Sequence, residues 1–389
     1  MPDNDLIMIV AGEASADAHA AALLRELSAL RPGISVFGAG GSRLRDAGAE
    51  LLFDFSEVGV VGFTEILPAL PKFWTAYRSL LAAAAQRRPR GLILLDLPDF
   101  NLMLARKVRN LSPQTRIIYY ISPQVWAWRK GRVKTIARRA DAMLVIFPFE
   151  EEIYRQAGMD VEFVGHPLSD SAHPSAPAEE LRREFGLTGS PVVALLPGSR
   201  RAEVEKLLPV MAEAGRRIAE THPDIQFVLP RALTLPEELI AGRLGAIAGR
   251  TRVVAGRACD ALAAADAAVI ASGTATLEGA IIGTPMVVIG ALSWASYIMA
   301  KPFVHVTHVS LPNVIAGRGI VPELLQDEAR PDRLVAELLN LLDHREKLSE
   351  MRAELGQVRL ALGPGGSSRR AAEAVARRLW PESVQAPQP

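Results

Sequence analysis

Asp96 is the side chain best placed for acid–base chemistry in this sequence. It opens the segment 96–101 (DLPDFN), which follows the apolar run 91–95. In an open parallel sheet, ligands bind outside the carboxyl ends of the strands, so a carboxylate here can accept the proton of a substrate hydroxyl. Asp99 has the position of a helix N-cap, which leaves Asp96 as the candidate catalytic base. His19 is the next candidate.

A phosphate-binding site is indicated by residues 197–201 (PGSRR), which follow the apolar run 192–196. Gly198 and Ser199 stand where a helix begins, and the free backbone N–H groups of a helix start favour an anion. Arg200 can bond a phosphate through two parallel N–H groups. In a purely structural interpretation, Arg200 only pairs with Glu203.

The same pattern of strand, glycine turn and helix recurs at residues 272–278 (SGTATLE). Its N–H groups, together with Thr274, can hold a diphosphate. Glu278 lies one helical turn further on and can accept both hydroxyls of a ribose. A helix cap alone explains Thr274, but it does not explain why this motif and PGSRR coincide in one half of the expected binding cleft.

Two further loops follow strands in the first half of the chain. Residues 12–17 (GEASAD) combine a turn-forming glycine with Ser15 and Asp17, which are common N-cap types, so this loop is either a capped helix start or a site for an anion or a sugar hydroxyl. Residues 122–129 (SPQVWAWR) carry Trp126 and a second tryptophan, which can stack on a sugar ring or pack in the core.

Continuous apolar runs alternate with amphipathic helical patterns, which predicts parallel sheets with helices on both faces. The Pro- and Ser-rich segment 166–177 reads as a linker. We therefore expect an α/β protein of two doubly wound, Rossmann-like domains facing a cleft, with a helical C-terminal segment. The expected strands are 6–11, 34–37, 91–95, 116–121, 142–147, 161–164, 192–196, 225–229, 252–255, 268–271 and 286–289.

The expected domains are residues 1–165, residues 166–360, and a C-terminal helix and tail over 361–389 that pack back on an N-terminal domain. A chain of 389 residues with 49% hydrophobic residues is large enough for two cores.

The net charge of +1 argues against a nucleic-acid partner. The single cysteine, Cys259, excludes an internal disulfide and suits a reducing compartment.

Residues 279–300 carry no charge and are long enough to cross a bilayer, but a proline, glycines and hydroxyl residues interrupt them. We expect a short buried strand, a turn and a helix there rather than a membrane span. The first strand begins near Leu6 with no apolar leader before it, so no signal peptide is expected.

Nine segments together resemble the lipid-A-disaccharide synthase family. They occur in the family's order over most of the chain, and SPQVWAWR and LPGSR with SGTATLE are specific to the family rather than to its fold. The segments are GEASAD (12–17), GVVGFTEIL (59–67), DLPDFN (96–101), YISPQVWAWR (120–129), FPFE (147–150), VGHPLSD (164–170), LLPGSRRAEVE (195–205), SGTATLE (272–278) and VSLPNVIAGR (309–318).

The resemblance implies a GT-B fold, with the acceptor in the N-terminal half and the nucleotide in the C-terminal half. It implies that UDP-2,3-diacylglucosamine donates its sugar to 2,3-diacylglucosamine 1-phosphate (lipid X), giving a β-1,6 disaccharide and UDP. No metal or other cofactor takes part. The family works at the cytoplasmic face of the inner membrane and exchanges C-terminal elements in a homodimer.

The motifs and the resemblance together give the candidate site residues. Asp96 and His19 are the catalytic candidates. An apolar segment contains Val61, Phe63, Leu67 and Trp74. These residues either contact lipid and the membrane or pack in the ordinary core. The candidate substrate- and nucleotide-binding residues are Glu13, Ser15, Asp17, Ser122, Trp126, Gly198, Ser199, Arg200, Ser272, Gly273, Thr274, Thr276, Glu278, Asn313 and Arg318.

The chain departs from the family at two places. Ala16 stands where the family usually has glycine, and Gly290-Ala291 replaces a Tyr-Arg pair, which removes a cation that Arg318 would have to supply. The alternatives are another GT-B enzyme, such as a peptidoglycan N-acetylglucosaminyltransferase or a UDP-sugar epimerase, or a non-catalytic nucleotide-sugar or lipid-binding protein. A nicotinamide-dependent oxidoreductase is disfavoured because no G-x-G-x-x-G fingerprint follows the first strand.

Overall fold

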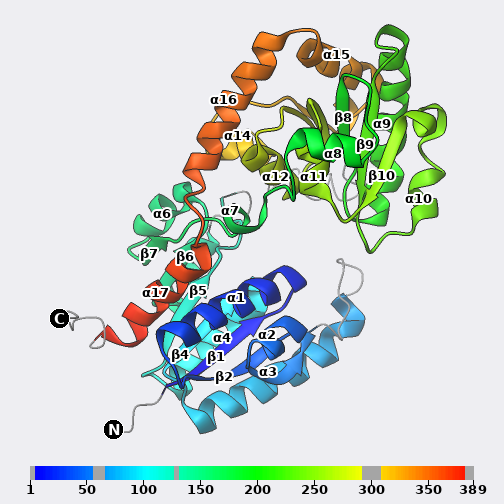
Figure 1. Cartoon of the computed structure of the whole chain (residues 1–389). Coiled ribbons are helices and arrows are strands. Elements are labelled where there is room, and N and C mark those ends of the chain that lie inside the picture. Colours follow the sequence, from blue (N-terminus) through cyan, green and yellow to red (C-terminus); the bar gives the residue numbers. More distant parts are fainter. Residues whose placement is uncertain (1–4, 56–65, 127–130, 291–307, 382–389) are drawn as a thin grey trace. The chain divides into compact units, whose positions relative to one another are not determined.

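The computed structural model describes residues 5–55, 66–126, 131–290 and 308–381, with no side-chain detail for residues 66–70. The chain divides into two compact units, Met1–Pro167 with Gly363–Pro389, and Leu168–Leu362. Each unit is built on one sheet with every strand parallel, and helices cover the sheets (Figure 1).

The first unit holds a seven-stranded sheet of order β3-β2-β1-β4-β5-β6-β7. Its strands are β1 Leu6–Ala11, β2 Ser35–Gly40, β3 Glu50–Asp54, β4 Gly91–Leu95, β5 Arg116–Tyr120, β6 Ala142–Val145 and β7 Asp160–Phe163. Its helices are α1 Ala14–Leu30, α2 Ser42–Asp46, α3 Ile66–Arg87, α4 Pro98–Leu111, α5 Arg132–Arg139, α6 Pro148–Arg155 and α17 Ser367–Leu379.

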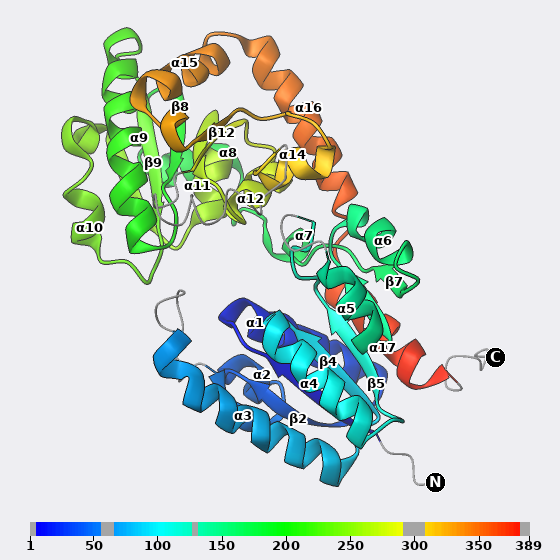
Figure 2. The same ribbon diagram turned by 180° about the vertical axis from the view of Figure 1, so that it is seen from behind.

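The second unit holds a six-stranded sheet of order β10-β9-β8-β11-β12-β13. Figure 2 gives the view from behind Figure 1. Its strands are β8 Val192–Leu196, β9 Gln226–Arg231, β10 Thr251–Ala255, β11 Ala267–Ala271, β12 Met286–Gly290 and β13 Glu323–Leu325. Its α-helices include α7 Leu168–Ser171, α8 Ala178–Glu184, α9 Arg201–Thr221, α10 Glu237–Ala241, α11 Ala258–Ala264, α12 Ala275–Ile282, α14 Leu311–Ala316, α15 Pro331–Leu342 and α16 Arg345–Ala361.

All eleven expected strands are present, with ends shifted by at most three residues. The sequence pattern does not predict β3 and β13, which both lie at a sheet edge. β3 has five residues with an acidic residue at each end, and β13 has three that begin with Glu323. Short, charged edge strands resist edge-to-edge pairing, and the same composition removes the continuous apolar run by which central strands are recognised.

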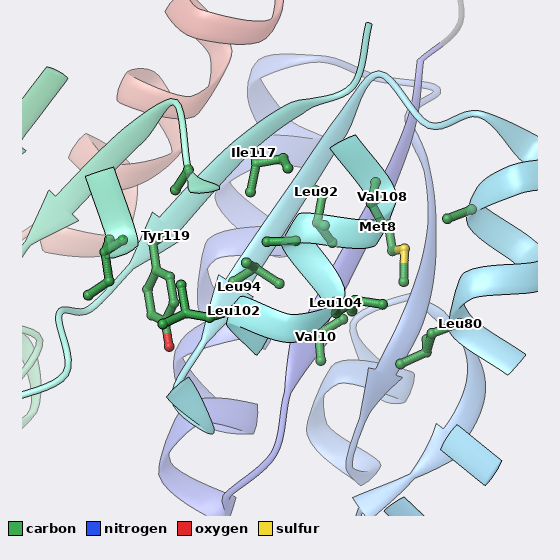
Figure 3. Packing of buried hydrophobic residues seen from close by; sticks show 14 of the residues in the cluster. Met8, Val10, Leu80, Leu92, Leu94, Leu102, Leu104, Val108, Ile117 and Tyr119 are labelled. Atoms are coloured by element: carbon green, nitrogen blue, oxygen red, sulfur yellow. The ribbon is translucent and has the colours of Figure 1, made fainter. Parts of the chain in front are cut away.

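The core of the first unit forms where α3 and α4 cover the middle of its sheet. Met8 and Leu92 are fully buried on β1 and β4, and Leu104 of α4 and Leu80 of α3 pack in the same cluster (Figure 3). Central strands buried on both faces need apolar residues at every position, and β4 has all five of its residues buried. This rigid centre carries the loop that begins at Asp96.

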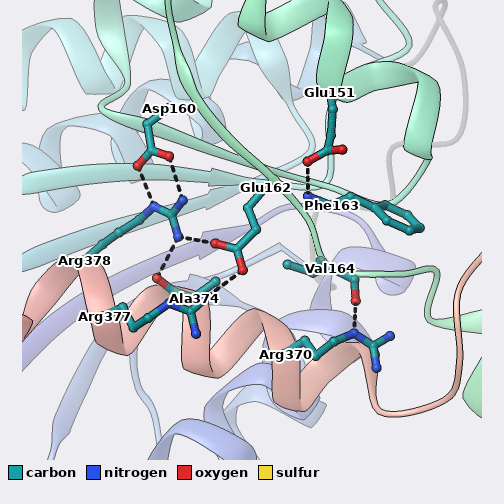
Figure 4. A network of polar contacts seen from close by, with 9 residues as sticks. All are labelled: Glu151, Asp160, Glu162, Phe163, Val164, Arg370, Ala374, Arg377 and Arg378. Carbon is teal, nitrogen blue, oxygen red and sulfur yellow. Dashed lines mark hydrogen bonds and ion pairs between the residues drawn. The ribbon is translucent and has the colours of Figure 1, made fainter. Parts of the chain in front are cut away.

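The C-terminal helix α17 packs on α1 and joins the first unit. Arg378 bridges Asp160 and Glu162 of β7 at 2.7 Å each, and Arg377 also pairs with Glu162 (Figure 4). Just beyond the helix, the indole N–H of Trp380 donates to Asp5 at 2.8 Å. These contacts tie the C-terminal segment to the edge strand β7 and to the start of β1.

Candidate catalytic carboxylate and nucleotide pocket

Asp96 sits in a strained turn between β4 and α4. Its φ is +49° and that of Leu97 is +33°, in the left-handed region that costs a non-glycine residue about 1–3 kcal/mol. Tyr119 Oη donates to the carbonyl of Asp96 at 2.5 Å, and Asn101 Nδ2 donates to the carbonyls of Leu95 and Asp96 at 2.8 and 2.9 Å. Tyr119 and Asn101 therefore hold the turn that positions Asp96.

The Asp96 carboxylate lies at the N-terminus of α1. Its two oxygens accept the backbone N–H groups of Gly12 at 3.0 Å and Glu13 at 2.6 Å. A Cβ at position 12 would lie 2.0 Å from Leu97 Cδ1, so any side chain there would displace Leu97. The structure thus brings the DLPDFN and GEASAD segments together around one carboxylate.

Burial raises the pKa of Asp96 to about 7, although the hydrogen bonds from Gly12 and Glu13 lower it. A base works best when its pKa is near the working pH, since it is then both ionised and able to hold a proton. At neutral pH Asp96 can therefore accept a proton more readily than an ordinary surface aspartate.

The expectation that Asp99 caps α4 is wrong. The N-cap position is Leu97, because Pro98 starts the helix, as proline commonly does at the first helical position. Asp99 lies in the first turn and pairs with Arg132 at 2.6 Å, with its own side chain 79% exposed.

The N-cap interpretation of Ser15 and Asp17 is also wrong. Helix α1 begins at Ala14, so Glu13 occupies the cap position, and no side chain makes a cap hydrogen bond. Asp17 is buried and accepts the N–H groups of Gly41, Arg43 and Leu44 at 2.7–3.1 Å, which secures the start of α2. Ser15 is exposed, and burial lowers the pKa of His19 further along α1.

Ser122 and Trp126 belong to a buried polar cluster that also contains Glu150 of α6. Ser122 Oγ and Tyr154 Oη lie 2.7 Å apart, and Trp126 packs edge-on against Phe149 at 5.5 Å between ring centres. Glu150 Oε2 is buried without a hydrogen-bond partner among the residues that the structure describes. Glu150 was not among the candidates, although it ends the FPFE segment.

Glu150 should make stability depend on pH. Burial raises its pKa from 4.5 to about 8. Between these values the folded protein keeps a proton that the unfolded chain has lost, so the free energy of unfolding falls as pH rises, by at most about 1.4 kcal/mol per pH unit. Urea unfolding should show Glu150→Gln gaining stability relative to wild type from about pH 5 to about pH 8. A constant difference would mean that folding does not shift this pKa.

The second unit has a pocket of about 460 Å³ at the carboxyl ends of its central strands. It brings together the two predicted anion motifs, which follow β8 and β11. Arg231 at the end of β9 and Gly256 after β10 also line it, and motif reading missed both. The predicted residues that line the pocket are Gly198, Ser199, Arg200, Ser272, Gly273, Thr274 and Glu278.

Arg200 and Glu203 meet at one end of this pocket. Arg200 Nη1 lies 2.9 Å from Glu203 Oε1, while Glu203 Oε2 accepts the Arg200 backbone N–H at 3.2 Å. Gly198 has φ +110°, and a Cβ there would lie 2.3 Å from Glu203 Oε2. The structural pairing of Arg200 therefore exists, but its guanidinium side chain remains 72% exposed and lines the pocket.

The helix after SGTATLE differs in detail from the expectation. Thr274 occupies the N-cap of α12 but makes no side-chain cap bond, which leaves its hydroxyl available to a ligand. Thr276 is fully buried, does not line the pocket, and donates its hydroxyl to the carbonyl of Gly273 at 2.7 Å. Burial raises the pKa of Glu278 on the pocket wall.

Comparison with known proteins decides the family. The model of the family described as lipid-A-disaccharide synthetase matches residues 7–377. The chain belongs to the lipid-A-disaccharide synthetase family. The lipid-A-disaccharide synthase of Anaeromyxobacter sp. (strain K) is 48% identical over 374 residues, 96% of this chain and 97% of that protein. That of Geobacter sulfurreducens is 46% identical, with the same coverage of both chains.

Solved structures of low sequence identity share the fold, which is of the GT-B type. The UDP-GlcNAc 2-epimerase of Neisseria meningitidis, solved with UDP-GlcNAc bound, has a TM-score of 0.65 at 12% identity and covers 96% of this chain and all of its own. The calicheamicin glycosyltransferase CalG4 has a TM-score of 0.58 at 16% identity, with full coverage of both chains. Both glycosyltransferases and epimerases therefore use this architecture.

Asn313 and Arg318, which are expected to bind substrate, make contacts within the second unit. The Asn313 side-chain amide donates to the Val321 carbonyl and to Glu323, and its oxygen accepts the N–H groups of Ile320 and Val321. Arg318 pairs with Glu354. Neither residue lines the pocket formed by the two anion motifs, and substrate binding by either residue stays a prediction.

The expected lipid-contact residues of this family member are described only in part. Val61 and Phe63 lie outside the described residues, as does Ala291, and the Leu67 side chain is not described. Trp74 is 55% exposed and stacks on Tyr77 with 5.3 Å between ring centres. An indole held this way offers an apolar surface to solvent.

The described part of the chain gives no sign of a metal centre or a membrane span. No group of three or more His, Cys, Asp or Glu side chains among these residues is arranged to hold a metal ion. None of the helices described is both long and apolar enough to cross a bilayer.

Proposed function

We propose that the protein transfers 2,3-diacylglucosamine from its UDP conjugate to 2,3-diacylglucosamine 1-phosphate, forming the β-1,6-linked lipid A disaccharide 1-phosphate and UDP. The family match over residues 7–377 is the observation that carries this proposal. The phosphate-binding character of the pocket around Ser199, Arg200 and Thr274 supports a nucleotide-sugar donor.

The proposed reaction is a single displacement at the anomeric carbon of the donor. The 6-hydroxyl oxygen of the acceptor forms the new bond while its proton passes to the Asp96 carboxylate. The bond from the anomeric carbon to the diphosphate oxygen breaks, and UDP leaves with the electron pair. Arg200 and the N–H groups at the start of α12 would stabilise the charge that grows on the departing diphosphate.

Tyr119 and Asn101 take a positioning role in this mechanism. They hold the left-handed turn through its backbone carbonyls and make no hydrogen bond to the carboxylate among the contacts of the described residues. Because both Asp96 oxygens also accept backbone N–H groups, the carboxylate has one orientation before substrate binds. A fixed base avoids the cost of reorientation during the reaction.

Turnover with matched donors tests the proposal. Purified protein and 2,3-diacylglucosamine 1-phosphate should release UDP from the diacylated donor but not from UDP-N-acetylglucosamine. Conversion of UDP-N-acetylglucosamine to its 2-epimer, without an acceptor, would instead assign the epimerase activity of the structural neighbours.

Activity should persist in excess EDTA, because Arg200 and backbone N–H groups take the place of a divalent cation beside the diphosphate. The measurement is initial UDP release with and without chelator at saturating donor. Complete loss of activity, restored by magnesium or manganese, would contradict this arrangement.

We also propose that the protein works at the cytoplasmic face of the inner membrane, because both substrates carry acyl chains. Trp74, exposed on α3, is a described candidate for the membrane contact. A homodimer with exchanged C-terminal segments is a further proposal. In such a dimer, the exchanged segment would occupy the surface where Leu379 and Trp380 now contact Arg90 and Asp5 of their own chain. Light scattering of the purified protein measures the oligomeric state.

A further inference from the structure

An apolar groove runs along helices α5 and α6 of the first unit, away from the residues assigned to catalysis. It measures about 890 Å³, within the usual range for a small-molecule site. Asp96 does not line it, although Trp126 does. Its apolar walls are Val125, Trp126, Val133, Ala137, Ile153 and Ala157.

Two cations stand along this groove one helical turn apart. Lys134 and Arg138 are exposed on α5 and line the groove, and neither has a carboxylate partner among the residues described. Arg138 only donates to the backbone carbonyl of Lys134, at 3.2 Å. Their neighbour Arg132, in contrast, is paired with Asp99. An apolar groove with unpaired positive charge at its rim suits an amphiphile with an anionic head.

The position of the cations separates this groove from the reacting groups. Arg138 lies at the end of α5, just before β6 begins, and Gln156 follows α6, shortly before β7 begins. Both residues therefore lie toward the amino-terminal edge of the sheet. Asp96 lies at the carboxyl edge, directly after β4. At 1.5 Å per helical residue, Arg138 is about 9 Å along α5 from Arg132. Arg138 therefore lies toward the edge of the sheet opposite to the one that carries Asp96.

We propose that the α5–α6 groove binds an acidic membrane phospholipid, with one acyl chain along Val133 and Ile153 and the phosphate on Lys134 and Arg138. This inference rests on the proposed function, in which the protein acts at a membrane surface. It adds to that function a lipid-binding site that selects for an anionic headgroup. Attraction of a basic side chain to an anionic surface is modest for each residue, so two adjacent cations are needed for a measurable preference.

Vesicle flotation of the full-length protein tests the site. Wild type should bind vesicles of phosphatidylcholine with phosphatidylglycerol at least about 10-fold more tightly than vesicles of phosphatidylcholine alone. Lys134→Glu with Arg138→Glu should abolish that preference. The control pair Arg252→Glu with Arg359→Glu makes the same charge change at exposed positions of the second unit. This control should keep the preference for vesicles with phosphatidylglycerol.

Filling the groove tests the acyl chain separately. Ala137→Trp leaves the charge unchanged and should weaken binding to the phosphatidylglycerol vesicles by about 10-fold at an unchanged melting temperature. Unchanged binding of this variant, or equal binding of the charge-reversed pair and wild type, would overturn the proposal.

Turnover in detergent micelles distinguishes this site from the acceptor site. The charge-reversed pair should keep wild-type turnover with dispersed substrates, because Lys134 and Arg138 act on the membrane and not on the reacting molecules. A parallel loss of turnover in detergent would assign the groove to the acceptor and contradict a phospholipid occupant. Vesicle binding can be measured even if the proposed transfer reaction is not observed.

Discussion

Asp96→Asn should lower kcat by about 10²-fold or more while leaving UDP affinity unchanged. The loss follows from removing a base whose pKa, raised to about 7 by burial, suits proton transfer at neutral pH. UDP affinity should not change, because Asp96 does not line the nucleotide pocket. Steady-state kinetics and calorimetry with UDP measure the two quantities.

The structure adds a cost in stability to this substitution. Each carboxylate oxygen of Asp96 accepts one backbone N–H group. The side chain of asparagine has only one oxygen, so it can accept only one of these two hydrogen bonds. We expect the free energy of unfolding to fall by about 1–3 kcal/mol, as for one unsatisfied donor. Asp99→Asn is the matched control, since the Asp99 side chain is 79% exposed and pairs with Arg132 rather than with the Gly12 and Glu13 N–H groups, and it should keep activity.

The pH dependence of the wild type provides an independent check. Since the base must be ionised, kcat/KM should rise as pH increases through about 7, the pKa to which burial raises Asp96. If Asp96→Asn keeps more than about a tenth of wild-type kcat, the base lies elsewhere, and His19 is the next residue to replace.

Arg200→Ala should weaken UDP binding by about 10- to 100-fold and reduce turnover with it. A hydrogen bond to a charged group contributes about 1.5–3 kcal/mol, and a contact to the diphosphate acts in both the ground and transition states. Titration calorimetry with UDP is the direct measurement. Arg200 already pairs with Glu203, so the phosphate must compete with this carboxylate for the guanidinium.

Arg201→Ala is the control for this second prediction. Arg201 carries the same charge next to Arg200 and pairs with Glu205 at 3.3 Å, but it does not line the pocket. It should bind UDP as wild type does. Equal affinity of UDP for the Arg200 variant and wild type would remove Arg200 from the nucleotide site.

The architecture could be predicted from the sequence because buried parallel strands leave a local signal. Runs such as VVALL in β8 are apolar at every position, and the motifs follow directly at their carboxyl ends. Position after a strand also predicted that PGSRR and SGTATLE would line one pocket. The short edge strands β3 and β13 lack this signal.

The partners of buried polar side chains could not be read from the sequence. Asp17 bonds to residues 24 to 27 positions away, and Asp96 to residues 83 and 84 positions away. Residue type marks each of them as a possible cap or base, but the fold decides which role it takes. The hydrogen bonds of the Asn313 amide to Val321 and Ile320 were likewise not predictable from the sequence.

The most direct test follows the acceptor itself through the reaction. Acceptor 1-phosphate labelled with ³²P, incubated with UDP-2,3-diacylglucosamine and separated by thin-layer chromatography, should move to the position of the disaccharide 1-phosphate with wild-type protein. With Asp96→Asn at equal donor occupancy, the labelled product should form at least about 10²-fold more slowly. Labelled acceptor that remains unchanged with folded, UDP-binding wild-type protein would contradict the proposed glycosyl transfer.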